Sequence, residues 1–307
     1  AELGPYDENR VGDGGVKITP RTLQVYLGNV DIKFSPNSVY STIWGANAMN
    51  GEALKNVPIT LQVLQLLALK MGKNLNLHLF DAVRNDQGKG SKDLFNGFDT
   101  IAKTELTNAK LSSELGNLIK VSDILGSDAS ISDDNAVDFA QAICESADEE
   151  LIGEEKLYLY VPQAFINLYN RNYLKKFGNV PYNTGYNHNT IEGFDNVEMV
   201  PLVNKKNAPF FQLTTRNNML VGVNEANNSD EEKISVEKYH PWKLDFIATK
   251  FFGCQYESIN KERLLVITND GTTPLIQKTS LAEAASNTAS GDPVDTSSSD
   301  TDDEGKE

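Results

Sequence analysis

The amino-terminal segment of the chain constrains the fold most, because it has too few apolar residues to build a core of its own. Residues 1–20 (AELGPYDENRVGDGGVKITP) are polar and rich in glycine. Thr22 to Leu27 and Val30 to Phe34 follow as two short strand-like runs around Gly28-Asn29, a pair typical of a tight hairpin turn. An isolated hairpin is only marginally stable in water. Residues 1–20 are therefore either disordered or an arm that lies on a neighbour, and we predict that other copies of the chain complete the hairpin.

The residues expected at such an assembly interface belong to the two runs and to the turn between them. They are Leu23, Val25, Tyr26, Gly28, Asn29, Ile32 and Phe34. After Ser35-Pro36-Asn37, which ends the second run, Ser38 to Trp44 could form a short helix.

Helical periodicity begins at Ile59 and continues to about Phe80. The apolar residues that follow the spacing of three and four are Leu64, Leu67, Ala68, Met71, Leu75 and Leu79. Pro58 stands where a first helical residue tolerates proline. A helix over this range would be about 33 Å long at 1.5 Å per residue. The following stretch, Asn85 to Gly97, is a loop by composition.

A second helix is predicted from Ala136 to Leu151, with Phe139, Ala140, Ile143 and Ala147 on one face. Asp133 and Asp134 precede it as candidate caps. Leu157 to Val161 reads as a buried strand. Pro162 opens a third helix, for which Lys175, Lys176 and Gly178 form a suitable carboxyl-terminal stop.

Beyond Gly178 the chain is rich in predicted strands, punctuated by Asn, Gly, Pro and Asp. The candidates are Val197–Val203, Phe210–Leu213, Met219–Val223, Ile234–Glu237, Leu244–Phe252 and Arg263–Thr268. After Gln277 the composition shifts to Ser, Thr, Ala and Asp, which predicts a disordered tail.

The charge of the chain argues against a groove that grips nucleic acid. The 307 residues carry a formal net charge of −15. Residues 281–307 hold eight acids against Lys306, so this tail carries −7 and the body carries the remaining −8. Neutralising phosphates requires basic surfaces. A negatively charged surface would repel packed DNA weakly, which suits a protein that forms a container.

Candidate catalytic and metal-binding groups are few and scattered. The three histidines, His78, His188 and His240, have no second His, Cys or acid at metal-ligand spacing. No GxSxG elbow occurs, and the glycine-rich stretch at Gly88 lacks the first glycine of a phosphate loop. Cys144 and Cys254 are expected to be small apolar residues in a reducing compartment. We predict no enzyme, no cofactor and no metal.

Four stretches in order resemble the major capsid proteins of tailed bacteriophages, the Hong Kong 97-type family. Residues 155–178 (EKLYLYVPQAFINLYNRNYLKKFG) resemble a strand, "VSP" turn and tyrosine-bearing helix, here without the Ser. Thr215 to Gly222 resembles "TPK-N-L-hydrophobic-G", but lacks its Pro and Lys. Phe252-Gly253-Cys254-Gln255 matches an aromatic-Gly-Val-Gln motif, and Asn96-Gly97-Phe98 a "GF" after the spine helix. The resemblance spans about Thr22 to Thr268.

The resemblance implies an α+β fold with an amino-terminal arm, an extended β-hairpin loop, a long spine helix, and peripheral and axial domains. The implied boundaries are 1–20 for the arm, 21–57 for the extended loop, 58–135 for the peripheral domain with the spine helix, 136–225 for the axial domain, 226–277 for the return strands of the peripheral domain and 278–307 for the tail. Some relatives crosslink subunits through a lysine of the extended loop. Lys33 is the only lysine of the predicted hairpin, but no motif identifies a partner, so crosslinking is not carried over.

The resemblance also implies a function: self-assembly into pentamers and hexamers of an icosahedral head that encloses double-stranded DNA without sequence-specific contact. Implied partners are a scaffolding protein, a maturation protease, a portal and decoration proteins, with no membrane. The implied location is the virion, assembled in the cytoplasm of the bacterial host. Two alternatives stay open. One is an encapsulin-like shell that encloses cargo enzymes, and the other is a β-rich glycan- or surface-binding module using the loop from Pro181 to Asn189.

Overall fold

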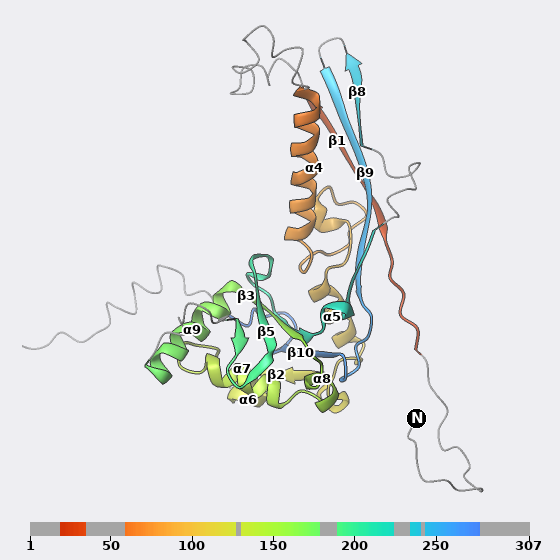
Figure 1. The fold of residues 1–307 in the computed structure, drawn as a ribbon. Coiled ribbons are helices and arrows are strands. Elements are labelled where there is room, and N and C mark those ends of the chain that lie inside the picture. Colours follow the sequence, from red (N-terminus) through yellow and green to blue (C-terminus); the bar gives the residue numbers. More distant parts are fainter. Residues whose placement is uncertain are drawn as a thin grey trace, which may run out of the picture. The chain divides into compact units, whose positions relative to one another are not determined.

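The computed structural model describes residues 19–34, 59–126, 130–178, 189–223, 234–240 and 243–276. These residues form an α+β fold with two β-sheets and helices between and beside them (Figure 1). The predicted short helix at Ser38, the loop that contains His188 and the acidic tail after Gln277 lie outside the described residues.

The larger sheet has six strands in the order β2-β10-β6-β3-β5-β4. Their bounds are β2 Leu118–Lys120, β3 Leu157–Pro162, β4 Thr190–Ile191, β5 Phe194–Leu202, β6 Phe211–Thr214 and β10 Leu264–Thr268. β3 pairs with β5 in parallel and with β6 antiparallel, so the sheet is mixed. The predicted strands in these four regions of the chain, around β3, β5, β6 and β10, are confirmed.

Both faces of this sheet are buried, and the alternation along β10 shows how. Leu265 and Ile267 pack into one apolar cluster with the helices of residues 121–178, whereas Leu264 and Val266 pack into a second cluster on the other face. Successive residues of a strand point to opposite faces. A strand buried on both faces needs an uninterrupted apolar run, which is why β10 reads LLVIT without polar alternation.

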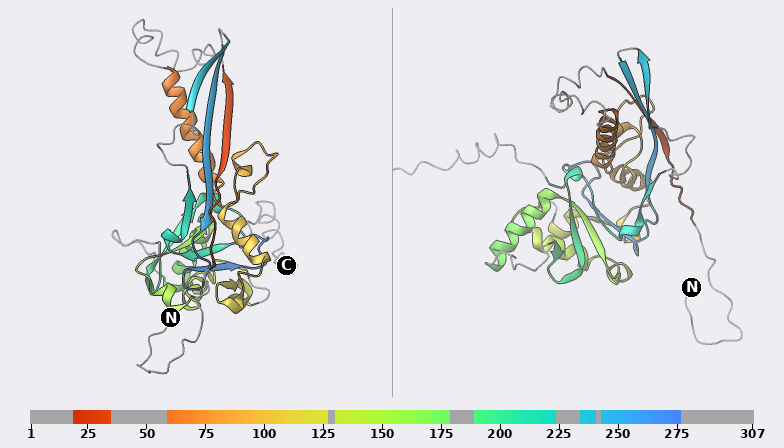
Figure 2. Two further views of the ribbon diagram at one scale, coloured as in Figure 1. Left: turned by 90° about the vertical axis from the view of Figure 1, so that its right-hand side faces the viewer. Right: turned by 45° about the horizontal axis from the view of Figure 1, so that its top comes forward.

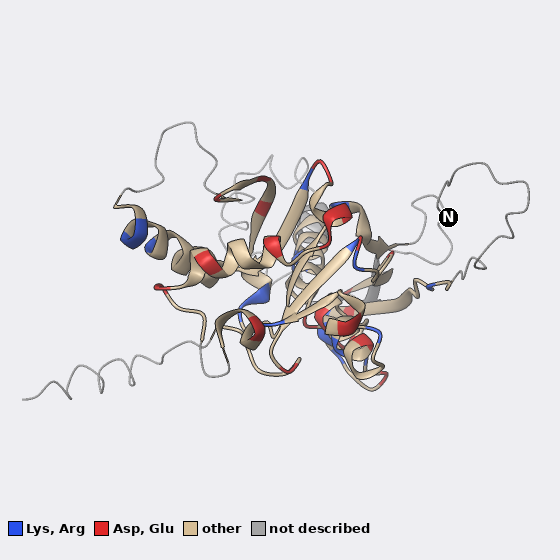
Figure 3. Ribbon diagram, turned by 90° about the horizontal axis from the view of Figure 1, so that it is seen from below, with Lys and Arg blue, Asp and Glu red and all other residues tan. Residues whose placement is uncertain are grey.

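The helices on the first face are α6 Val121–Leu125, α7 Ala136–Glu145, α8 Glu149–Ile152 and α9 Gln163–Phe177. As predicted, α9 begins after Pro162 and ends at Gly178, which adopts the left-handed conformation at φ 66°. Lys175 and Lys176 lie in its last turn, where cations favour the helix dipole. This end of α9 is the blue one at the left of Figure 3.

Two details of the predicted second helix are wrong. The segment forms α7 and α8 rather than one helix to Leu151, because the Asp148 carboxylate accepts a hydrogen bond from the backbone N–H of Glu150 (3.1 Å) and so starts a new helix. The predicted caps Asp133 and Asp134 instead pair with Lys175. The free N–H near the start of α7, that of Val137, donates to the Asn172 side chain of α9 at 2.9 Å.

The smaller sheet is built around β9 Lys243–Tyr256, the longest strand. Its first part pairs antiparallel with β1 Tyr26–Phe34 and β8 Ile234–His240, and its last part pairs with β7 Met219–Gly222. The strand predictions at β7, β8 and β9 are confirmed. The predicted hairpin turn is wrong: Gly28 and Asn29 lie inside one continuous strand, opposite Lys250 and Thr249.

The helix α4 Ile59–Leu77 confirms the predicted long helix, although it ends three residues earlier. Figures 1 and 2 show it running alongside β1 and β9. Near its carboxyl end, α5 Phe98–Thr107 and the aromatic residues Phe80, Phe95, Phe252 and Tyr256 form the second apolar cluster. The short 3-10 helices are η1 Ser91–Asp93, η2 Ser113–Leu115, η3 Val203–Lys205 and η4 Arg216–Asn218.

Candidate assembly interface

The segment before β1 lies across two glycines that face each other in the smaller sheet. Gly222 of β7 is the register partner of Gly253 of β9. A Cβ atom at Gly253 would lie 2.1 Å from the Gln24 carbonyl oxygen, and one at Gly222 would lie 2.6 Å from Val25 Cγ1. Such distances are far below van der Waals contact. We call this place the glycine seat: only residues without side chains let the arm approach the sheet so closely.

Arg21 fastens the arm beside the glycine seat. Its guanidinium donates to Glu105 of α5 (2.9 Å), to the Gln255 side-chain oxygen (2.9 Å) and to the Tyr256 carbonyl (3.1 Å). The Gln255 amide in turn donates to the Thr22 carbonyl at 3.3 Å. The ion pair between Arg21 and Glu105 is largely buried, at 15% and 11% side-chain exposure, so water screens it less than a surface pair. Part of the segment expected to lie on other copies is thus held by its own chain.

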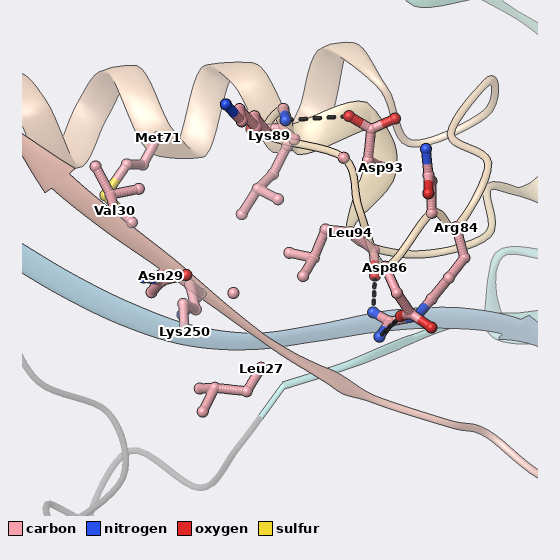
Figure 4. A pocket seen from close by; sticks show the side chains of 16 residues that line it. Leu27, Asn29, Val30, Met71, Arg84, Asp86, Lys89, Asp93, Leu94 and Lys250 are labelled. Carbon is pink, nitrogen blue, oxygen red and sulfur yellow. Dashed lines mark hydrogen bonds and ion pairs between the residues drawn. The ribbon is translucent and has the colours of Figure 1, made fainter.

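Within β1, one set of side chains packs on the chain's own loop of residues 84–94. The Arg84 guanidinium lies over the Tyr26 ring, 3.8 Å from its centroid, and donates to the Leu94 carbonyl at 2.7 Å. A Cβ at Gly28 would come within 2.9 Å of Leu94 Cδ2. Glycine at position 28 therefore serves close packing rather than a turn. Figure 4 shows this side of β1, where a pocket of about 440 Å³ separates the strand from α4.

The segment also keeps large apolar side chains in water, on both of its faces. Val25, Leu27 and Ile32 are 39%, 52% and 39% exposed. Of the other predicted interface residues, Leu23 is half-buried at the glycine seat, Asn29 is exposed, and the Phe34 side chain lies outside the described residues. β1 also stands at the end of its sheet, so within the described part of the chain one of its edges has no strand partner. Such an edge can template pairing with another chain.

The helix α4 adds apolar surface that the sequence prediction assigned to no interface. Leu66 and Leu69 are 51% and 63% exposed, whereas Leu75 is buried and Met71 is half-buried. Leu66 and Leu69 lie outside the predicted apolar face, on which Leu67 and Met71 are half-buried and Leu75 is buried. A soluble chain rarely leaves several large apolar groups of one region in water unless they meet a partner.

A buried polar triad, which the sequence prediction missed, joins three elements beneath the surface. Lys205 Nζ donates to Asp99 Oδ1 (2.9 Å) and Gln212 Oε1 (2.5 Å), and the Gln212 amide donates to Asp99 Oδ1 (2.6 Å). Lys205 also lies over the Phe80 ring, 4.5 Å from its centroid. Burial raises the pKa of Asp99 and lowers that of Lys205, while their mutual attraction opposes both shifts. No local motif marks three residues so far apart in the chain.

The candidate reactive residues that the structure describes are either buried or close to a neighbouring side chain. Cys144 and Cys254 are free and buried, as predicted, and burial raises the pKa of each thiol to about 12. His78 Nδ1 lies 2.9 Å from Asp81 Oδ1. Among the described residues, His, Cys, Asp and Glu nowhere gather in a group of three that could hold a metal ion. The described helices include none that is both long enough and apolar enough to cross a membrane.

Comparison with known proteins places the fold among viral and virus-like shells. No protein-family model matches the chain, and no curated protein sequence matches it. Among solved structures, the capsid of a native GTA particle superposes with a TM-score of 0.53 at 11% identity, over 87% of this chain and 81% of that one. A chain of the satellite phage P4 procapsid, which includes the size determination (Sid) protein, superposes with a TM-score of 0.50 at 11% identity, over 87% and 84%.

These likenesses establish the fold, because they cover most of both chains. The protein therefore has the α+β fold of capsid proteins, as the sequence resemblance implied.

Proposed function

We propose that the protein is a major capsid protein of a tailed bacteriophage, a shell subunit that assembles with copies of itself into pentamers and hexamers of an icosahedral head. The observation that carries this proposal is the shared fold with capsid structures over 87% of the chain. The exposed apolar residues of β1 and α4 support it, because they offer surface that a partner copy can bury.

Within this proposal the subunit is structural rather than enzymatic, and its shell encloses double-stranded DNA without sequence-specific contact. Scaffolding protein, maturation protease, portal and decoration proteins are the partners that such a shell needs. The protein belongs to the virion and assembles in the cytoplasm of the bacterial host. The acidic body and tail support passive enclosure, because a net charge of −15 cannot neutralise phosphates over a wide surface.

The test is assembly of the purified chain, followed by sedimentation velocity and negative-stain electron microscopy. We expect closed particles of uniform size, or discrete pentamers and hexamers that close when the scaffolding protein from the same genome is added. A chain that stays monomeric under both conditions would refute the proposal.

The contents of particles taken from their natural source separate the two shell functions. A phage head yields double-stranded DNA, measured by absorbance ratio and nuclease protection. An encapsulin-like shell yields a cargo enzyme by mass spectrometry and no genome-length DNA. Binding to glycans by the monomer, without any assembly, would favour the β-rich binding module instead.

A further inference from the structure

A groove beside the carboxyl end of α4 is the surface that the proposed function leaves unexplained. It consists of two adjoining pockets of about 600 and 610 Å³, which share Leu77, Val203 and Asn204. The pockets lie between α4, the segment around η3, β7 and the start of α5. We call this surface the η3 groove.

The η3 groove is basic, although the chain as a whole is strongly acidic. The basic residues that line it are Lys73, Lys92, Lys103, Lys205, Lys206 and Arg216. Its acidic lining residues are Asp81 and Asp99, and Asp99 is already bound to Lys205 inside the protein. Asp81 lies near His78 and, at 3.7 Å, near Lys92. Within the described residues, Lys73, Lys103, Lys206 and Arg216 have no ion-pair partner.

The same groove exposes apolar side chains. Val203 is 79% exposed, and Leu77 and Val221 are 49% and 46% exposed. These three residues come from η3, α4 and β7, and they line the same two pockets as the basic residues. A surface of this mixed kind suits a protein partner better than a nucleic acid, because phosphates and sugars would leave the valine and leucine side chains without apolar contacts.

The buried polar triad holds the groove in place. Lys205 is the last residue of η3, and its 1%-exposed side chain is fixed by Asp99 and Gln212. The Asn204 amide donates to the Asn76 carbonyl of α4 at 2.6 Å. Because Asn204 and Lys205 are held in these ways, the residues on either side of them, Val203 and Lys206, are presented to solvent in a defined arrangement.

We propose that the η3 groove docks a second copy of this chain through an acidic segment that carries apolar side chains. Charge complementarity carries the choice of partner, since each copy has a net charge of −15 and the groove is basic. Figure 3 shows acidic residues spread over several elements of the chain. The contact joins two different surfaces of the copies, and a head-to-tail contact of this kind generates rings when the rotation closes. The proposal rests on the proposed function, and it names one of the surfaces through which the copies meet.

Charge-reversing substitutions in the groove test this contact. The double variant Val203→Asp with Lys206→Glu should fold with an unchanged thermal midpoint, because both side chains are exposed. Sedimentation velocity should show that it assembles only at a subunit concentration at least about tenfold above that of the unsubstituted chain. The matched control is Leu115→Asp with Lys120→Glu, which makes the same changes of charge at exposed residues outside the groove and should assemble normally.

If the groove variant and the control assemble alike, the proposal is overturned while the proposed function stands. Failure of the unsubstituted chain to assemble under every condition counts instead against the proposed function. The two failures are therefore distinguishable in one series of runs.

Carbodiimide crosslinking identifies the partner directly, because it joins a lysine amine to a carboxylate in contact with it. Particles assembled from equal amounts of isotopically light and heavy copies are crosslinked, digested and analysed by mass spectrometry. We expect peptides in which Lys103 or Lys206 of one copy is joined to an Asp or Glu of another. Links confined to single copies would contradict the proposal, as would protection of these lysines by added duplex DNA alone.

Discussion

The two sheets of this protein differ in how far the chain itself buries their apolar side chains. In the six-stranded sheet, the chain itself covers both faces of β10, so that all five of its residues are buried. The sheet around β9 receives the arm on the glycine seat but leaves Val25, Leu27 and Ile32 in water. The first region therefore carries the stability of the single subunit, and the second has surface left for other copies. The predictions below test this division.

The largest effect on the stability of the subunit is expected in the six-stranded sheet. Phe211 is fully buried, with its ring centroid 5.2 Å from that of Phe165. Replacing Phe211 with Ala should lower the free energy of unfolding by about 3–5 kcal/mol, because it removes apolar contacts and leaves a cavity. Chemical denaturation of the isolated subunit measures this loss. A loss below about 1 kcal/mol would show that this sheet is not the main core.

The second largest loss of stability is expected at the buried polar triad. Lys205→Met leaves the Asp99 carboxylate buried without its cation and should cost about 3 kcal/mol. The double variant Asp99→Asn with Lys205→Met should recover most of this loss, because a neutral amide can still bond Gln212. The measurement is a double-mutant comparison by denaturant titration. Equal losses in the single and double variants would contradict the assignment.

A smaller effect is expected at the glycine seat. Gly253→Ala places a methyl group where the Gln24 carbonyl lies, which should displace the arm and cost about 1–3 kcal/mol. Hydrogen exchange at residues 19–25 and trypsin cleavage after Arg21 should both accelerate. Gly72→Ala in α4 is the control, because no atom lies within 4 Å of its added Cβ and alanine favours a helix. Unchanged hydrogen exchange at residues 19–25 in Gly253→Ala would show that the glycine seat does not hold the arm.

Low pH should destabilise the turn that follows β10 of the six-stranded sheet. The Asp270 carboxylate accepts from the N–H groups of Thr272 and Thr273 (2.8 and 2.7 Å), and these bonds lower its pKa below the ordinary value of 3.8. Since the unfolded chain then takes up the proton more readily, this contribution to stability is present above that value and is lost as the pH falls below it. Asp270→Ala should flatten the acid limb of the stability profile. An identical profile in the variant would be contrary evidence.

The smallest effect on the stability of the single subunit is expected in the sheet around β9. Leu27→Ser should change the free energy of unfolding by no more than about 0.5 kcal/mol, because the side chain is 52% exposed. Sedimentation should nevertheless show weaker assembly, since the apolar group is lost from the surface offered to other copies. Destabilisation of the monomer without any change in assembly would show that Leu27 stabilises the single subunit and does not contact other copies.

The regular elements were predictable because they depend on local patterns. The periodicity from Ile59, the stop at Gly178 and the apolar run of β10 each mark their element within a few residues. The prediction at Gly28-Asn29 was wrong because the partner of β1 lies more than two hundred residues away, and a local turn motif contains no information about a distant strand. The split between α7 and α8 was missed because a capping aspartate looks like any helical acid until its hydrogen bond is known.

The candidate interface stays a prediction, because exposure in one copy does not show contact with another. Val25 and Ile32 are exposed, whereas Tyr26 and Gly28 contact Arg84 and Leu94 of the same chain, which no local pattern indicates. The basic residues of the η3 groove come from five separate stretches of sequence. Nothing in any one stretch shows that they converge.

The glycine seat also has a consequence for engineering the protein. Gly253 faces the main chain at Gln24 and Val25, whereas Gly222 faces the side chains of Leu23 and Val25. The Gln24 side chain is exposed, so we expect that it can be exchanged for other residues that favour extended backbone, provided that Arg21, Leu23 and Val25 are kept. A peptide tag fused ahead of residue 19 would then leave the body from a known point on its surface.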